Sequence, residues 1–133
     1  MTDTSAFDCI ADHLDYPMFV VSAAADADAD VCLIGFTSQC SIDPVRVAVF
    51  LSKKNHTYEL ARHASVIVVH RLRTNQHEVA EHFGGTSKKD DPSKLAEWPW
   101  RPGPEGAPVI QDCDWCAGRI ESTSTPAITW RSC

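Results

Sequence analysis

Two clusters of small polar residues flank one apolar segment between residues 36 and 57. The first cluster comprises Thr37, Ser38, Gln39, Cys40 and Ser41, and the second comprises Ser52, Lys53, Lys54, Asn55, His56 and Thr57. Hydroxyl groups, free backbone N–H groups and a lysine at the start of a helix are the groups that bind a phosphate. This part of the chain therefore predicts a site for a phosphorylated ligand.

Each cluster also fits an interpretation without a ligand. Thr37 and Ser38 suit a strand end that leads into the Asp43-Pro44 turn. Asn55 and Thr57 suit ordinary helix capping, which uses the same N–H groups as phosphate binding. The lysines next to them also suit a solvated surface, so residue types alone leave both interpretations open.

The elements around the clusters follow from hydrophobic periodicity. Strands are expected over residues 13–23, 31–38, 45–52, 65–72, 108–111 and 114–121, and helices over 7–14, 57–64 and 74–83. Residues 23–30, AAADADAD, are expected to form an exposed eight-residue hairpin loop. Several antiparallel strands with short helices and no strict β-α alternation predict a mainly β (α+β) protein, a β-barrel with appended helices.

Bulk properties exclude several classes of protein. A chain of 133 residues is expected to form one domain, and its net charge of −6 disfavours nucleic acid as a partner. The apolar runs are of strand length, so no membrane span is expected. The polar N-terminus does not have the pattern of a signal peptide, which makes a cytoplasmic location the expectation.

The six cysteines do not form an evident metal site. Only Cys113 and Cys116 have C-x-x-C spacing, and they lie in a segment that reads as a strand. Residues three apart on a strand point to opposite faces, so a shared metal would require a turn. We expect structural thiols and no bound metal.

Four motifs, taken in order, resemble the flavin reductase family. They are Phe36-Thr37-Ser38 with Asp43-Pro44, then Asn55-His56-Thr57, then residues 77–85 (HEVAEHFGG), then Trp100 followed by Gly103 and residues 106–109 (GAPV). Together they span about residues 13–121. Family members bind FMN in a split β-barrel of Greek-key type, so the resemblance implies that fold here.

The resemblance also implies a function and a site. A homodimer would bind FMN, with FAD or a deazaflavin as alternatives, and NAD(P)H would reduce the flavin by hydride transfer. Thr37 to Ser41 would lie beside the isoalloxazine, and Ser52, Lys53, Asn55 and Thr57 would hold the ribityl phosphate. Phe83 would be a flavin neighbour or a core residue at a helix end. Hydride transfer to a flavin needs no acid or base from the protein.

Two classes of function remain open after the resemblance. The first is an NAD(P)H:flavin oxidoreductase that acts alone or supplies reduced flavin to a partner monooxygenase. The second is a non-catalytic split barrel that binds flavin or haem, or an inactive truncated family member. Flavin-dependent oxidation of NADH would distinguish them.

The C-terminus departs from the family pattern. Residues 1–121 correspond to the expected domain, whereas residues 122–133 have no strand alternation and contain Pro126. Reading the codons of the last eight residues one base earlier permits Ala-Gly-Asp-His-Val-Ala-Leu-Leu, the motif that family members have there. We therefore expect a frameshifted, truncated end, a poorly packed tail, and a barrel without its last strand or strands; natural divergence of the tail is the alternative.

Overall fold

The structure is a computed structural model that describes residues 5–85, 90–124 and 127–132. Its helices and strands are α1 (Ser5–Ala11), β1 (Phe19–Ala25), β2 (Asp28–Ile34), β3 (Thr37–Ile42), β4 (Val45–Phe50), α2 (His56–Ala61), β5 (Val66–Arg71), α3 (His77–Gly84), β6 (Trp100–Pro102), the 3₁₀ turn η1 (Pro104–Gly106), β7 (Pro108–Ile110), β8 (Asp114–Thr123) and β9 (Ala127–Ser132). All paired strands are antiparallel. The prediction of a mainly β protein with short helices is confirmed.

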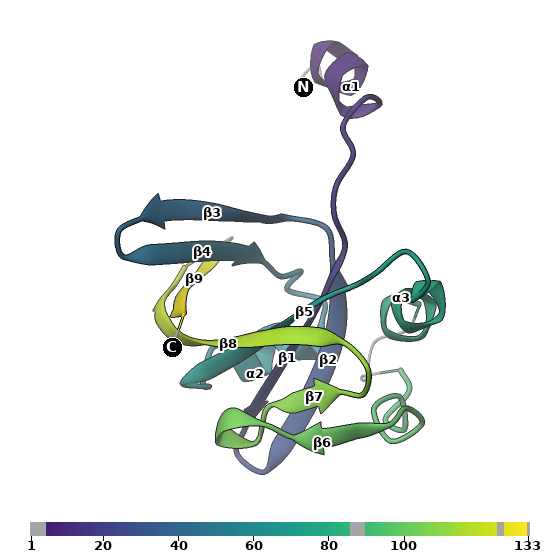
Figure 1. Cartoon of the computed structure of the whole chain (residues 1–133), viewed down its shortest axis with the longest axis vertical. Helices are drawn as coiled ribbons and strands as arrows, with labels where there is room; N and C mark the ends of the chain where they lie inside the picture. Colours follow the sequence, from purple (N-terminus) through teal and green to yellow (C-terminus); the bar gives the residue numbers. More distant parts are fainter. Residues whose placement is uncertain (1–4, 86–89, 125–126, 133) are drawn as a thin grey trace.

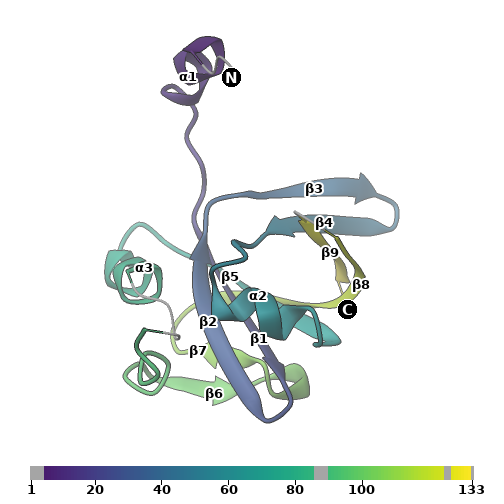
Figure 2. The same ribbon diagram turned by 180° about the vertical axis from the view of Figure 1, so that it is seen from behind.

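One seven-stranded sheet forms most of the molecule, in the order β2-β1-β5-β8-β9-β4-β3. The sheet curls, and β2 and β3 are its two edges (Figures 1 and 2). The pair β6-β7 forms a separate two-stranded sheet that packs against β1 and β5. The described strands thus form a split barrel that strand pairing does not close.

The hairpin β1-β2 differs from the prediction for residues 23–30. Pairing continues to Ala25 and Asp28, so only Asp26 and Ala27 form the turn. Both turn residues have positive φ values, 52° and 62°, as a tight primed hairpin turn requires. The expected eight-residue loop is therefore wrong, because alternating Ala and Asp were taken as a linker rather than as strand residues.

The segment 31–38 also differs from the prediction, because it divides into two strands at Gly35-Phe36. Thr37 begins β3, which pairs with β4 as a hairpin that projects from the rest of the sheet (Figure 1). A β-bulge between Gln39 and Ser41 leaves Cys40 out of the register. Bulges are common next to functional sites, where they redirect side chains.

The C-terminal segment is a strand of the sheet. Residues 127–132 form β9, which pairs with both β8 and β4 and joins the two halves of the sheet. Ile128 has 1% of its surface exposed and packs in the core. The expected poorly packed tail is wrong for these residues, because β9 is paired on both sides and Ile128 is buried. Strand pairing nevertheless does not close the barrel, and a frameshifted, truncated end without the last strand or strands stays a prediction. Ile128 and the neighbouring strands supply enough pairing and burial to offset the weak alternation.

Hydrophobic side chains pack on both faces of the β1-β2-β5 part of the sheet. Val21 and Ala23 of β1 pack inward with α2, whereas Val20 packs outward with α3 and β7. Both faces of β1 are therefore covered, which explains why this strand reads as an apolar run without alternation. No described helix is both long and apolar enough to span a lipid bilayer.

Candidate functional site

A polar pocket of about 420 Å³ lies beside the second predicted cluster. It is lined by Lys53 from the loop after β4, Tyr58 and Arg62 from α2 and its C-terminal end, and Thr123 and Ser124 from the end of β8. The antiparallel register brings these segments together, because β9 returns from the end of β8 to pair with β4. The pocket therefore depends on the C-terminal strand.

The two cations of this pocket are available to a ligand. Neither Lys53 nor Arg62 makes an ion pair or hydrogen bond through its side chain to another described residue. The Arg62 guanidinium lies over the Tyr58 ring, 5.9 Å from the ring centroid, which orients it. Two unpaired cations and two hydroxyl side chains are a suitable donor set for a phosphate.

The remaining predicted phosphate residues have different environments. Ser52 Oγ accepts a hydrogen bond from the Lys54 backbone N–H at 3.3 Å, so it orders the loop that presents Lys53. Asn55 is the N-cap residue of α2, although its side chain makes no capping hydrogen bond. Both residues lie close in sequence to the pocket, but only Lys53 of the predicted four lines it.

Thr57 is fully buried and faces the other side of α2. Its Oγ1 donates a hydrogen bond to Asp30 Oδ2 on β2, at 3.0 Å. The hydroxyl therefore ties α2 to the sheet, and the proton that would be donated to a phosphate is already donated to a carboxylate. The geometry favours a positioning role for this residue over direct contact with a ligand.

Asp30 is the centre of a buried polar cluster that sequence reasoning missed. Its Oδ1 lies 3.7 Å from Lys94 Nζ, and both side chains are almost completely buried. Cys32 lies beside Thr57 and Asp30, and burial raises the pKa of its thiol to about 12, so the thiol is protonated and unreactive. A buried ion pair of this kind links the segment after α3 to β2 and, through Thr57, to α2.

The first predicted cluster lies on β3. Ser38, Gln39 and Cys40 are exposed, and Thr37 Oγ1 donates to the Ala48 carbonyl at 2.9 Å. β3 is the last strand in the sheet order, so the backbone groups on its outer edge have no strand partner among the described residues. The cluster thus presents hydroxyl groups and a row of backbone donors and acceptors.

The register places the two clusters near each other at one end only. Thr37 pairs with Val49, close to Ser52 and Lys53, whereas Ser41 pairs with Arg46 at the far end of the hairpin. Ser41 lies four positions along the strand from Thr37, a span of about 13 Å. An extended ligand with a phosphate at Lys53 would have its remaining length along β3.

Phe83 is a core residue in this structure. It has 2% of its surface exposed and packs against Trp98 and His82 beneath α3, with ring centroids 6.0 and 4.8 Å away. Its cluster lies on the outer face of β1 and β2. This position favours the core interpretation over the interpretation as a flavin neighbour.

Comparison with known families identifies the relationship. Residues 11–123 match the sequence profile described as flavin reductase like domain. The chain belongs to this family. The match includes both polar clusters, the pocket residues from Lys53 to Thr123, and the buried Asp30 and Lys94. A comparison with functionally curated proteins finds no match.

Solved structures show the same fold at low sequence identity. An FMN-binding domain of a flavin reductases-like enzyme from Shewanella baltica is 18% identical, with a TM-score of 0.78 over 87% of this chain and 65% of that chain. The NADH:FAD oxidoreductase of Streptomyces globisporus is 15% identical, with a TM-score of 0.76 over 99% and 81%. A nitrilotriacetate monooxygenase component B homologue from Mycobacterium thermoresistibile is 16% identical, with a TM-score of 0.77 over 98% and 72%. The chain thus spans about two thirds of the length of the Shewanella protein.

Sequence reasoning missed four of the five pocket residues for identifiable reasons. Tyr58 and Arg62 are four residues apart, and this spacing places both on one face of a helical turn next to Lys53. That signal was available in the sequence. Thr123 and Ser124 had no comparable signal, because their position depends on β9, which was not expected to form.

Proposed function

We propose that this protein binds FMN and uses NAD(P)H to reduce flavin. The observation that supports this most directly is the pocket with unpaired Lys53 and Arg62 at the end of the hairpin that presents the β3 edge. Family membership supports the same activity. The names of the similar structures, which mention FMN binding and NADH:FAD oxidoreduction, agree with it.

In this proposal the pocket holds the phosphate. Lys53 and Arg62 would bind its oxygens by charge-assisted hydrogen bonds, which are stronger than neutral ones. Arg62 suits a forked contact because Tyr58 holds its guanidinium plane. Ser52, by accepting the Lys54 N–H, and Asn55, at the N-cap, would fix the path of the loop that carries Lys53.

The isoalloxazine would lie along β3. Its polar edge alternates carbonyl and N–H groups, which match the donors and acceptors at the outer edge of a terminal strand. Thr37, Ser38 and Ser41 would add hydroxyl contacts, and the bulge at Cys40 would open the backbone there. When bound, the flavin supplies the chemistry of accepting a hydride, and the residues of this chain orient the ring and exclude water.

A second copy of the chain is a further part of this proposal. Helix α1 stands away from the sheet, and among the described residues it has none that is buried (Figure 1). Phe7, Ile10 and Leu14 are exposed there, and Phe36 and Ile42 are exposed on the hairpin side. In a homodimer these apolar side chains would be covered and the flavin would be shielded. We also propose a cytoplasmic location and a partner monooxygenase. The name of the Mycobacterium protein mentions a monooxygenase component for that protein.

A matched pair of lysines tests the phosphate site. Lys53→Gln should weaken FMN binding by about tenfold or more, because a charge-assisted hydrogen bond is worth roughly 1.5–3 kcal/mol. Riboflavin, which has no phosphate, should bind Lys53→Gln as it binds the wild type. Lys54 is exposed and does not line the pocket, so Lys54→Gln is the control. The measurement is a titration of each flavin by fluorescence.

Three results would contradict the proposal. Equal losses of FMN and riboflavin affinity in Lys53→Gln would show that the residue supports the fold and does not contact a phosphate. Flavin binding without flavin-dependent oxidation of NADH or NADPH would support the alternative, a non-catalytic flavin-binding split barrel. Tight binding of haem without flavin binding would identify a haem protein.

A further inference from the structure

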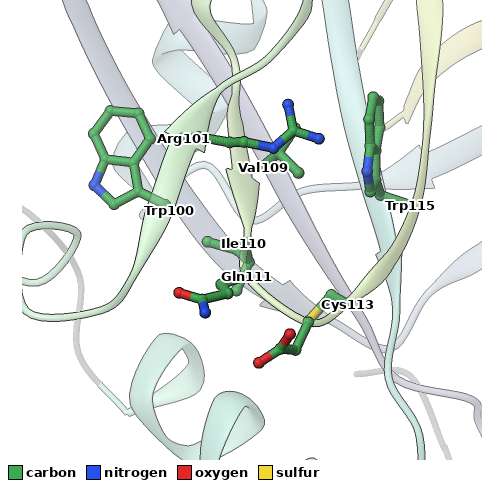
Figure 3. Close-up of a pocket in the computed structure, with 8 residues that line it drawn as sticks. Trp100, Arg101, Val109, Ile110, Gln111, Cys113 and Trp115 are labelled. Carbon is green, nitrogen blue, oxygen red and sulfur yellow. The ribbon is translucent and has the colours of Figure 1, made fainter.

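A second pocket, of about 300 Å³, lies between the β6-β7 hairpin and the start of β8. It is lined by Trp100, Arg101, Val109, Ile110, Gln111, Asp112, Cys113 and Trp115 (Figure 3). A volume of this size accommodates a small ligand. None of these residues belongs to the proposed flavin site.

The pocket has two aromatic walls with a cation between them. Trp100 and Trp115 lie on opposite sides, and the Arg101 side chain extends over Val109 toward Trp115 (Figure 3). The guanidinium carbon of Arg101 is 5.7 Å from the Trp115 ring centroid. The two indoles are 37% and 39% exposed, so a large part of each is available to a ligand. Indole faces stack with planar rings of a ligand.

Arg101 is the group of this pocket that can bind an anion. Arg101 makes no ion pair or hydrogen bond through its side chain to another described residue. Arg71 and Arg73 bond to the Asp114 carboxylate, which precedes Trp115 in β8, and Arg73 also donates to the Asp112 carbonyl. Of these three arginines, Arg101 is thus the one that lines the pocket and has no carboxylate partner among the described residues, although the lining also carries the Asp112 carboxylate. A cationic ligand, the usual occupant of an aromatic cage, would be repelled by Arg101.

The floor of the pocket is held in place before any ligand binds. The Ile110 N–H donates to His70 Nε2 at 3.0 Å, and His70 Nδ1 in turn bonds to the Val20 carbonyl at 2.9 Å. Gln76 Nε2 and an Arg73 guanidinium nitrogen both donate to the Asp112 carbonyl at 2.8 Å. A pocket built on anchored backbone loses little entropy when it binds.

This pocket is far from the proposed phosphate pocket. Trp115 lies near the start of β8, and Thr123, which lines the phosphate pocket, ends the same strand. Eight residues of extended strand correspond to about 26 Å. The two pockets therefore hold separate ligands or separate parts of an extended one.

We propose that this second pocket binds a mononucleotide group with an amino-substituted base. Trp115 and Trp100 stack on the base, and Arg101 binds the phosphate. The Gln111 amide and the Asp112 carboxylate are placed to pair with a ring nitrogen and an exocyclic amino group of the base. Adenylate has this chemistry, and it occurs both as a free mononucleotide and within a dinucleotide.

Calorimetry on the full chain with AMP as the probe tests the assignment. We expect Arg101→Gln and Trp115→Leu each to weaken AMP binding about tenfold or more, consistent with losing a charge-assisted contact or a stacking platform. Trp115→Phe, which keeps an aromatic ring, should retain most of the affinity. Lys53→Gln is the control and should bind AMP as the wild type does, while Arg101→Gln should bind FMN as the wild type does.

Companion ligands separate the parts of the proposal. Adenosine and inorganic phosphate should each bind at least about tenfold more weakly than AMP, because each lacks one of the two recognised groups. If NAD⁺ binds as tightly as AMP, the natural ligand is the adenylate part of a dinucleotide. If NAD⁺ binds much more weakly, the natural ligand is a free mononucleotide. No AMP binding at millimolar concentration, or AMP binding lost in Lys53→Gln but kept in Arg101→Gln, would overturn the proposal.

Discussion

Strands β1 and β3 belong to one sheet but have opposite environments. β1 is buried along most of its length, with core side chains on both faces. β3 is mostly exposed, and the hairpin that it forms with β4 projects from the sheet (Figure 1). Burial of apolar side chains is the main source of folding stability, so the β1 region determines whether the chain folds. The β3 region is free to recognise a ligand.

The difference extends to the polar residues of each region. Polar groups near β1 are bonded inside the protein, as in the pairs of Asp30 with Thr57 and Lys94 and of His70 with Val20 and Ile110. On β3, the side chains of Ser38 and Gln39 bond, among the described residues, only to neighbouring backbone carbonyls of their own exposed strand. Buried polar groups therefore serve the fold, whereas exposed ones keep capacity for a ligand.

The largest effect is expected from breaking the buried ion pair. Lys94→Met leaves Asp30 buried without its cation, and loss of one partner of a buried pair costs about 3–5 kcal/mol. Lys94 is 2% exposed, so water cannot replace it. Urea denaturation measures the free energy of unfolding. A loss below about 1 kcal/mol would show that the pair does not hold the segment after α3.

The double variant Asp30→Asn with Lys94→Met is the control for this prediction. It removes both charges, and the asparagine carbonyl still accepts the Thr57 hydroxyl. The double variant should therefore be more stable than Lys94→Met alone. Equal stability of the two variants would show that the cost arises from packing of the lysine stem rather than from an unpaired charge.

Substitutions at two isoleucines test the difference between a buried strand and the exposed β3-β4 hairpin directly. Ile128 on β9 is 1% exposed, whereas Ile42 at the tip of the hairpin is 85% exposed. Ile128→Ala should cost about 2–4 kcal/mol of unfolding free energy, because it leaves a cavity in the core. Ile42→Ala should change it by less than about 0.5 kcal/mol. Similar costs at the two positions would contradict the placement of β9 in the core.

His70 should make stability depend on pH. Burial lowers the pKa of this histidine from its ordinary value of 6.5, so the folded protein holds the ring neutral. The unfolded chain takes up a proton at higher pH than the folded protein does. The contribution of neutral His70 to the free energy of unfolding is therefore complete above pH 6.5. It is lost as the pH falls from 6.5 through the lowered pKa.

His70→Gln tests this dependence. The substitution should cost about 1–3 kcal/mol at pH 7.5, because at least one buried backbone group loses its partner. The difference in unfolding free energy between wild type and variant should decrease as the pH is lowered below 6.5. A difference that stays constant from pH 7.5 to 5.5 would mean that His70 does not contribute to the pH dependence.

Much of the buried part of the sheet, with β5 and β8, was predictable from the sequence. Residues 65–72 and 114–121 are rich in apolar and β-branched side chains, and they form β5 and β8 close to the expected bounds. Helix α3 ends at Gly84, where the Gly-Gly pair predicted its end. A Cβ at Gly84 would lie 2.6 Å from Leu33 Cδ2, so a larger residue there would displace the Leu33 side chain.

The exposed strand β3 and the contacts between segments far apart in the sequence were less predictable. β3 consists of small polar residues without apolar alternation, so its sequence reads as a turn, and β4 supplies the pairing that makes it a strand. β9 likewise forms because β4 and β8 flank it. The pairing of Asp30 with Lys94 joins residues 64 positions apart, and nothing local in the sequence indicates such a contact.

The smallest effect on stability and the clearest effect on binding are expected at Ser38. This residue is exposed, and within the described part of the chain its hydroxyl bonds only to the Gln39 carbonyl, so Ser38→Ala should change the unfolding free energy by less than about 0.5 kcal/mol. If β3 binds the flavin ring, loss of one hydrogen bond should weaken FMN and riboflavin equally, by about three- to tenfold. Ser65→Ala, at another exposed serine, is the control. Equal losses for both flavins place the contact at the ring, a loss for FMN alone places it at the phosphate, and unchanged binding of both removes Ser38 from the site.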